Sequence, residues 1–238
     1  METEKQASQR PILVIGNSHT TAIAGARSSA ERQLIDVVNL ASFFDPVNRR
    51  NKVLHRELVD LFHPQRIYCT FGGSEHSVFG LLESPIRFDF MTASQSQTEP
   101  GRDIVTYGLI RATLERAMNN AQIQARELRA MFSCPITHLC TPPPFREISG
   151  DVVLPRVFHD NLHVGISPPA IRKKLYEVHS DIARKAHVAM NIGFMEVPAE
   201  CADADGFLKS DYWSEDPTHG NRRYGELVIR QILGASNG

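Results

Sequence analysis

The stretch of sequence that decides the fold is Ile12-Leu13-Val14-Ile15-Gly16-Asn17-Ser18-His19. Its first four residues are a continuous apolar run, as expected of a parallel strand that is buried on both faces. The run ends in a turn at Gly16, and the Ala-, Arg- and Glu-containing segment after it continues as a helix. A strand that leads through a turn into a helix is typical of an α/β sheet. Ser18 is therefore expected at the carboxyl end of the sheet, where such sheets bind ligands.

Strands and helices are predicted to alternate along the rest of the chain. Apolar runs predict four more strands, at 34–40, 66–71, 136–140 and 194–197. Apolar residues recur at steps of three and four, which predicts amphipathic helices over 102–132 and, after an N-cap at Ser167, over 168–189. Shorter helices are expected over 51–62 and 222–233. This alternation predicts an α/β fold in which helices cover both faces of a parallel sheet.

Length and composition favour one globular domain. The 238 residues contain no internal repeat, linker or low-complexity tract, so we expect a flexible N-terminal tail over 1–10 and a single domain over 11–238. The formal net charge of -1, from 26 basic and 27 acidic residues, gives no indication of a nucleic-acid partner. No apolar run is long enough for a membrane span, and the N-terminal segment is polar. We therefore expect a cytoplasmic protein without nucleic-acid or membrane partners, and the oligomeric state is unknown.

The sequence predicts no metal and no cofactor. The four cysteines lack a CxxC pair and the density of a disulfide scaffold, so we expect reduced thiols in or near the core. His159 and His163 stand four residues apart, but the residues around them do not form a convincing helix and no third ligand is indicated. Neither a GxGxxG nor a Walker sequence occurs.

Two segments far apart in the sequence carry complementary chemistry. Ser18 follows the first strand, and Asp216-Pro217-Thr218-His219 precedes the last helix. A serine hydroxyl becomes a good nucleophile when an imidazole removes its proton and a carboxylate orients that imidazole. Taken alone, Ser18 is equally well explained as a helix cap, and an isolated DxxH motif more often holds a turn beside a solvated histidine. Their combination favours a Ser18–His219–Asp216 triad.

At these positions the sequence resembles the SGNH, or GDSL-like, hydrolase superfamily. The ILVIGNSH stretch at 12–19 resembles the first block of that superfamily, in which the serine follows Gly-Asp or Gly-Asn. FGGSEH at 71–76 resembles its third block in the GGNEH form, and DPTHGNRRYG at 216–225 resembles its fifth block. The order and spacing of the blocks match over almost the whole chain.

The resemblance implies a flavodoxin-like three-layer α/β/α sandwich around the five-stranded parallel sheet. It also implies serine ester hydrolase chemistry without a cofactor. In that chemistry Ser18 is the nucleophile, His219 the general base and Asp216 the carboxylate that orients the imidazole.

The sequence departs from the superfamily pattern where the oxyanion hole is expected. Ser74 stands where the third block has an asparagine, and the region 38–42, which matches the second block, offers no glycine. Besides Ser74, the candidate oxyanion or substrate-binding residues are Gly73, Asn39 and His76. Loss of one oxyanion donor typically costs about 2.7–4 kcal/mol. A slow or narrowly specialised enzyme is therefore expected.

These observations lead to three hypotheses about function. The first is an esterase that hydrolyses a small-molecule ester with a small acyl group, such as acetyl, through an acyl-enzyme. The second is an acyltransferase, in which a sugar hydroxyl captures the same acyl-enzyme in place of water. The third is a binding protein of the same fold with little turnover. The departures from the superfamily pattern at the oxyanion hole suggest this third hypothesis.

Overall fold

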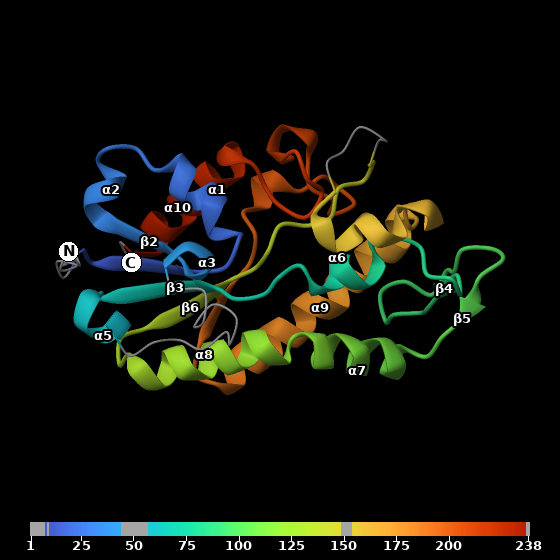
Figure 1. The fold of residues 1–238 in the computed structure, drawn as a ribbon, viewed down its shortest axis with the longest axis horizontal. Helices are drawn as coiled ribbons and strands as arrows, with labels where there is room; N and C mark the ends of the chain where they lie inside the picture. Colours follow the sequence, from blue (N-terminus) through green and yellow to red (C-terminus); the bar gives the residue numbers. More distant parts are fainter. Residues whose placement is uncertain (1–7, 9, 44–56, 149–153, 237–238) are drawn as a thin grey trace.

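The computed structural model describes residues 8, 10–43, 57–148 and 154–236, and its centre is a five-stranded sheet (Figure 1). The strands run parallel in the order β2-β1-β3-β6-β7. They are β1 (Ile12–Gly16), β2 (Ile35–Asn39), β3 (Arg66–Thr70), β6 (Ile136–Leu139) and β7 (Gly193–Met195). This is the flavodoxin-like order, in which the winding reverses between β1 and β3. The predicted α/β/α sandwich is confirmed, although β7 is shorter than expected and begins one residue earlier.

One layer of helices consists of α1 (Thr20–Ala26) and α10 (Arg222–Ser236). Alternate residues of β1, such as Ile12 and Val14, join an apolar cluster with Ile23 of α1 and Leu227 of α10. The two helices almost touch, because a Cβ atom at Gly225 would lie 2.2 Å from the carbonyl oxygen of Ala22. The glycine in α10 thus permits a close approach of the first helix and the last.

The opposite layer contains α5 (Glu57–Leu61), α8 (Asn119–Met131) and α9 (Pro169–Ala189). The other β1 residues, Leu13 and Ile15, pack in a cluster with Ala125 and Leu128 of α8. In Figure 1, α8 and α9 lie below the sheet, while α1 and α10 lie above it. The sheet therefore separates two apolar clusters, one on each of its faces.

The single long helix predicted over 102–132 is wrong, since the structure has two helices there. The first, α7, spans Tyr107–Ala117, and α8 begins at Asn119 after a break at Met118. Ile110, Leu114 and Met118 pack in a cluster with α9, whereas the apolar residues of α8 pack on the sheet. The two helices bury their apolar faces against different partners, α9 and the sheet. One straight helix could not contact both with its apolar face.

The remaining elements are short: α2 (Glu31–Leu34), α3 (Leu40–Phe43), α6 (Glu75–Gly80), β4 (Phe88–Asp89), β5 (Asp103–Ile104) and the 3-10 helices η1 (Arg156–Val164), η2 (Ala199–Cys201) and η3 (Ser210–Tyr212). Of the helix predicted over 51–62, the part before Glu57 lies outside the described residues. Of the expected tail over 1–10, Ser8 and Arg10 are described, and both contact the carboxylate of Asp36. Within the described ranges, no helix has the length and apolar character needed to cross a bilayer.

Candidate active site

Ser18 lies at the carboxyl end of β1, at the point where the winding of the sheet reverses. A Cβ atom at Gly16 would lie 2.2 Å from the carbonyl oxygen of Thr70, so only glycine lets the end of β1 approach β3 this closely. The Asn17 N–H donates to the same carbonyl oxygen at 3.1 Å. Ser18 follows this anchored turn, is exposed, and stands two residues before α1 begins. This is the position where flavodoxin-like sheets bind ligands.

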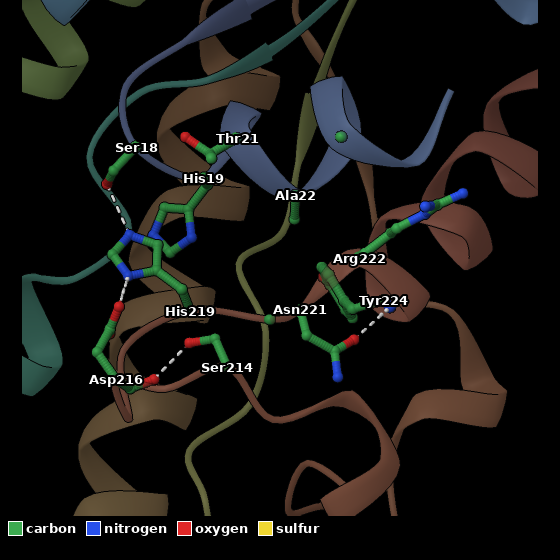
Figure 2. Close-up of a pocket in the computed structure, with 12 residues that line it drawn as sticks. Ser18, His19, Thr21, Ala22, Ser214, Asp216, His219, Asn221, Arg222 and Tyr224 are labelled. Atoms are coloured by element: carbon green, nitrogen blue, oxygen red, sulfur yellow. Dashed lines mark hydrogen bonds and ion pairs between the residues drawn. The ribbon is translucent and has the colours of Figure 1, made fainter. Parts of the chain in front are cut away.

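The structure brings His219 and Asp216 to Ser18 across 201 residues of sequence (Figure 2). The Oγ atom of Ser18 lies 2.7 Å from Nε2 of His219. On the other side of the ring, Nδ1 lies 2.9 Å and 3.0 Å from the two carboxylate oxygens of Asp216. All three side chains thus form one chain of hydrogen bonds.

The carboxylate of Asp216 is held in its ionised form. Its burial opposes ionisation, but hydrogen bonds from His219 and Thr218 outweigh this and lower the pKa of Asp216 to about 2. Thr218 donates to Oδ1 from its backbone N–H at 2.8 Å and from its hydroxyl at 2.6 Å. An ionised carboxylate keeps the proton on Nδ1 of His219, which leaves the lone pair of Nε2 facing Ser18. The arrangement can therefore take a proton from the serine hydroxyl.

His19 lies beside His219, a contact that the sequence did not predict. Its ring packs against the ring of His219, with 4.6 Å between the centroids. Burial, together with the nearby His219, lowers the pKa of His19 to about 3, so the ring is neutral at ordinary pH. Its Nε2 atom is buried without a hydrogen-bond partner among the described residues. His19 also lies against Gly73, because a Cβ atom there would come 2.9 Å from this nitrogen.

The turn after β3 contacts the carboxylate of Glu75. Gly72 and Gly73 have φ angles of +67° and +105°, which side chains other than glycine rarely adopt. The Gly73 N–H donates to Oε2 of Glu75 at 2.7 Å, and the same oxygen lies 3.0 Å from Nε2 of His179. Burial would raise the pKa of Glu75, but these partners lower it below the usual value. The buried contacts of Glu75 with Gly73 and His179 therefore fix this turn.

The four residues predicted for the oxyanion hole or substrate binding differ in whether their polar groups already have partners. The Gly73 N–H is already bonded to Glu75, and Oδ1 of Asn39 accepts from the Ala41 N–H at 2.9 Å. His76 is buried, with its ring against those of Tyr176 and His179. By contrast, neither the Ser74 hydroxyl nor the Ser18 N–H has a hydrogen-bond partner within the described ranges. These last two groups remain available as donors.

A groove of about 470 Å³ begins at the Ser18–His219 pair and runs between α1 and the start of α10. In Figure 2 the pair stands on one side, and Ala22, Tyr224 and Arg222 extend away from it. Gly25 and Gly220 also line the groove. The residues predicted for the oxyanion side are not among those of the described chain that line it.

Two sets of potential metal ligands were found away from the triad. His159 and His163 lie on η1, which forms where the sequence predicted irregular chain, and Nε2 of His159 is 2.9 Å from the carbonyl oxygen of Leu154. Cys69, His138 and His187 are buried, with ligand atoms within 4.8 Å of one another. However, the two imidazole rings stack with 18° between their planes, so their in-plane lone pairs run side by side and do not converge. We assign this second set to core packing.

Comparisons with known proteins agree with the fold. No protein-family model and no curated protein matches the chain. A solved protein described provisionally as a platelet activating factor, from Streptococcus pneumonia, is 12% identical with a TM-score of 0.53, over 96% of this chain and 84% of that one. A provisionally assigned SGNH hydrolase from Slackia heliotrinireducens is 14% identical with a TM-score of 0.45, over 97% and 100%. The first of these two proteins shares the overall α/β fold of this chain.

Proposed function

We propose that this protein is a serine ester hydrolase that cleaves a small acyl ester through an acyl-enzyme. The observation that carries the proposal is the hydrogen bond of 2.7 Å from Ser18 to His219, whose other nitrogen contacts the ionised Asp216. A structural helix cap would need neither a histidine at its hydroxyl nor a carboxylate behind that histidine. The exposure of Ser18 on the groove gives a substrate access to the hydroxyl.

In the first half of the reaction, the Ser18 oxygen bonds to the ester carbonyl carbon as its proton passes to Nε2 of His219. The ionised Asp216 stabilises the imidazolium that forms. The carbon–oxygen bond to the alcohol then breaks, and Nε2 returns the proton to the leaving oxygen. The products of this half are the free alcohol and an acyl group on Ser18.

In the second half, water takes the place of the alcohol. His219 removes a proton from the water as its oxygen bonds to the acyl carbon, and the same proton then returns to the Ser18 oxygen. The carboxylic acid leaves and the serine is regenerated.

Negative charge develops on the carbonyl oxygen in both halves. The Ser18 N–H and the Ser74 hydroxyl have no hydrogen-bond partner among the described residues, and we take them as the donors to this oxygen. A hydroxyl reaches less far than the asparagine amide of the superfamily pattern, so we expect slow turnover of generic esters.

Labelling with a fluorophosphonate tests the proposal, because such a reagent traps an activated serine. We expect intact-mass analysis to show one added phosphonyl group, peptide mapping to place it on Ser18, and a pH-stat assay to show acid release from a short-chain ester. A chain that binds ligand without turnover would show neither. Acid release that falls when a sugar is added, with an acylated sugar appearing by mass, would instead favour acyl transfer.

A further inference from the structure

We infer that the groove between α1 and the start of α10 binds the alcohol part of the ester, and that this part is an uncharged, largely hydrocarbon group. This inference rests on the proposed function and adds the substrate class to it. The groove is about 470 Å³, within the range of small-molecule sites and far larger than an acetyl group needs.

The position of His219 assigns the groove to the alcohol side. Its Nε2 must deliver a proton to the leaving oxygen, so the alcohol has to lie on the side of Ser18 that His219 occupies. His219 and the next residues along the chain, Gly220 and Asn221, line the groove. Ser74, the proposed oxyanion donor, follows β3 and is not among the described residues that line the groove, so a carbonyl oxygen that it binds would lie outside the groove.

Hydrogen bonding within the groove indicates an apolar occupant. The Ser214 hydroxyl donates to the Asp216 carbonyl oxygen at 2.6 Å. The Asn221 side chain is used twice, since it donates to the Asp211 carbonyl oxygen at 2.9 Å and accepts from the Tyr224 N–H at 3.1 Å. These polar groups already hold the backbone in place. What they leave to a ligand is mainly the apolar surface of Ala22, Gly25 and Tyr224, beside the exposed Thr21 and an Arg222 whose guanidinium is paired with Glu226 at 3.2 Å.

Gly25 keeps the groove open. It is exposed on α1, and a Cβ atom there would meet no other atom within 4 Å. Its φ angle is outside the left-handed region, so other residues fit the backbone. A large side chain at this position would therefore fill the groove without displacing the chain.

The test compares matched esters by pH-stat titration. Ethyl acetate and hexyl acetate share the acyl group, and their alcohols have similar acidity, so their kcat/KM ratio reports binding of the alcohol. Ethyl hexanoate reports the acyl side. In Gly25→Leu, we expect the ratio of hexyl acetate to ethyl acetate to fall by about tenfold or more, because the hexyl methylene groups lose their site. Gly108→Leu is the matched control, since Gly108 is an exposed helical glycine with equally open surroundings on α7.

The outcomes separate the two proposals. An unchanged hexyl-to-ethyl ratio, or a loss confined to ethyl hexanoate, would overturn the groove assignment while leaving the hydrolase intact. Absence of ester hydrolysis and of Ser18 labelling in the wild type would overturn the proposed function as well. If Gly25→Leu does not fold, Thr21→Phe serves instead, because Thr21 is exposed on α1 and lines the same groove.

Discussion

The candidate site has two parts, the base side around His219 and the oxyanion side around the turn at 72–74. They differ in how many of their hydrogen-bonding groups are free to act on Ser18 and its substrate. On the base side, His219, Asp216 and Thr218 form a continuous set of hydrogen bonds that ends on the serine hydroxyl. On the oxyanion side, where Gly73 lies against His19, the turn at 72–74 is held by the contacts of Glu75 with Gly73 and His179. There, however, the Gly73 N–H is used to hold the turn, and the side chain at position 74 is a short hydroxyl. Rigidity alone therefore does not make an oxyanion hole, since donors must also be left free.

The comparison implies that the two sides limit the reaction differently. The base side should set whether Ser18 reacts at all, whereas the oxyanion side should set how fast it reacts. Variants on the two sides therefore separate these contributions.

The largest effect is expected for Ser18→Ala, which removes the proposed nucleophile. We expect loss of fluorophosphonate labelling and a fall in kcat for a short-chain ester by about 10⁴-fold or more. Ser29→Ala is a matched control, because Ser29 is exposed beyond the end of α1. Labelling that survives Ser18→Ala would identify another residue as the nucleophile and remove the basis of the comparison.

Asp216→Asn should have the next largest effect, a fall in kcat of about 10³- to 10⁴-fold. The amide keeps the shape of the carboxylate but neither fixes the proton on Nδ1 of His219 nor stabilises the imidazolium. Steady-state kinetics with a thermal-unfolding control distinguish this from misfolding. A fall of only a few-fold in a well-folded variant would mean that His219 does not depend on Asp216.

Ser74→Asn tests the weaker side by restoring the longer donor. If the Ser74 hydroxyl faces the developing charge, we expect kcat to rise by up to about 100-fold with little change in KM, because the gain belongs to the transition state. Ser74→Ala should lower kcat by about 10- to 100-fold, because it removes a hydrogen bond to a charged oxygen, worth about 1.5–3 kcal/mol. No gain from asparagine and no loss from alanine would show that Ser74 is not an oxyanion donor.

The smallest effect concerns His19, which contacts both sides. Its pKa is about 3 in the folded protein but about 6.5 when unfolded. The unfolded chain therefore binds one more proton between these values, so the neutral ring supports stability above pH 6.5 and this support is lost as the pH falls towards 3. One proton corresponds to about 1.4 kcal/mol per pH unit.

Urea unfolding from pH 6 to pH 4 measures this slope. In His19→Phe, which keeps a ring against His219, we expect the loss of stability on acidification to become shallower by up to that amount. His63→Phe, at an exposed histidine, is the control. A slope unchanged in His19→Phe would mean that His19 is not buried in its neutral form.

The parts of the molecule that the sequence predicts well depend on local patterns. The apolar run at 12–15 is sufficient to predict β1, and the spacing of Asp216 and His219 predicts their contact because both lie on one turn. The break at Met118 could not be predicted, since the apolar spacing continues across it and only the packing partners change. The partner of Glu75 and the packing of His19 against His219 were likewise not predicted. Glu75 meets His179 across 104 residues, and no periodicity in the sequence encodes such a contact.

The packing of α1 against α10 also determines when the core and the candidate site can form during translation. Ser18 and α1 leave the ribosome first, and His219 follows 201 residues later, an interval of about 10 to 40 s at ordinary elongation rates. Until then, Ile12, Val14 and Ile23 lack the helix that covers them. A nascent chain therefore has an uncovered apolar face and a Ser18 that still lacks its His219 partner. The docking of α10 on α1 covers this face and brings His219 to Ser18 in the same step.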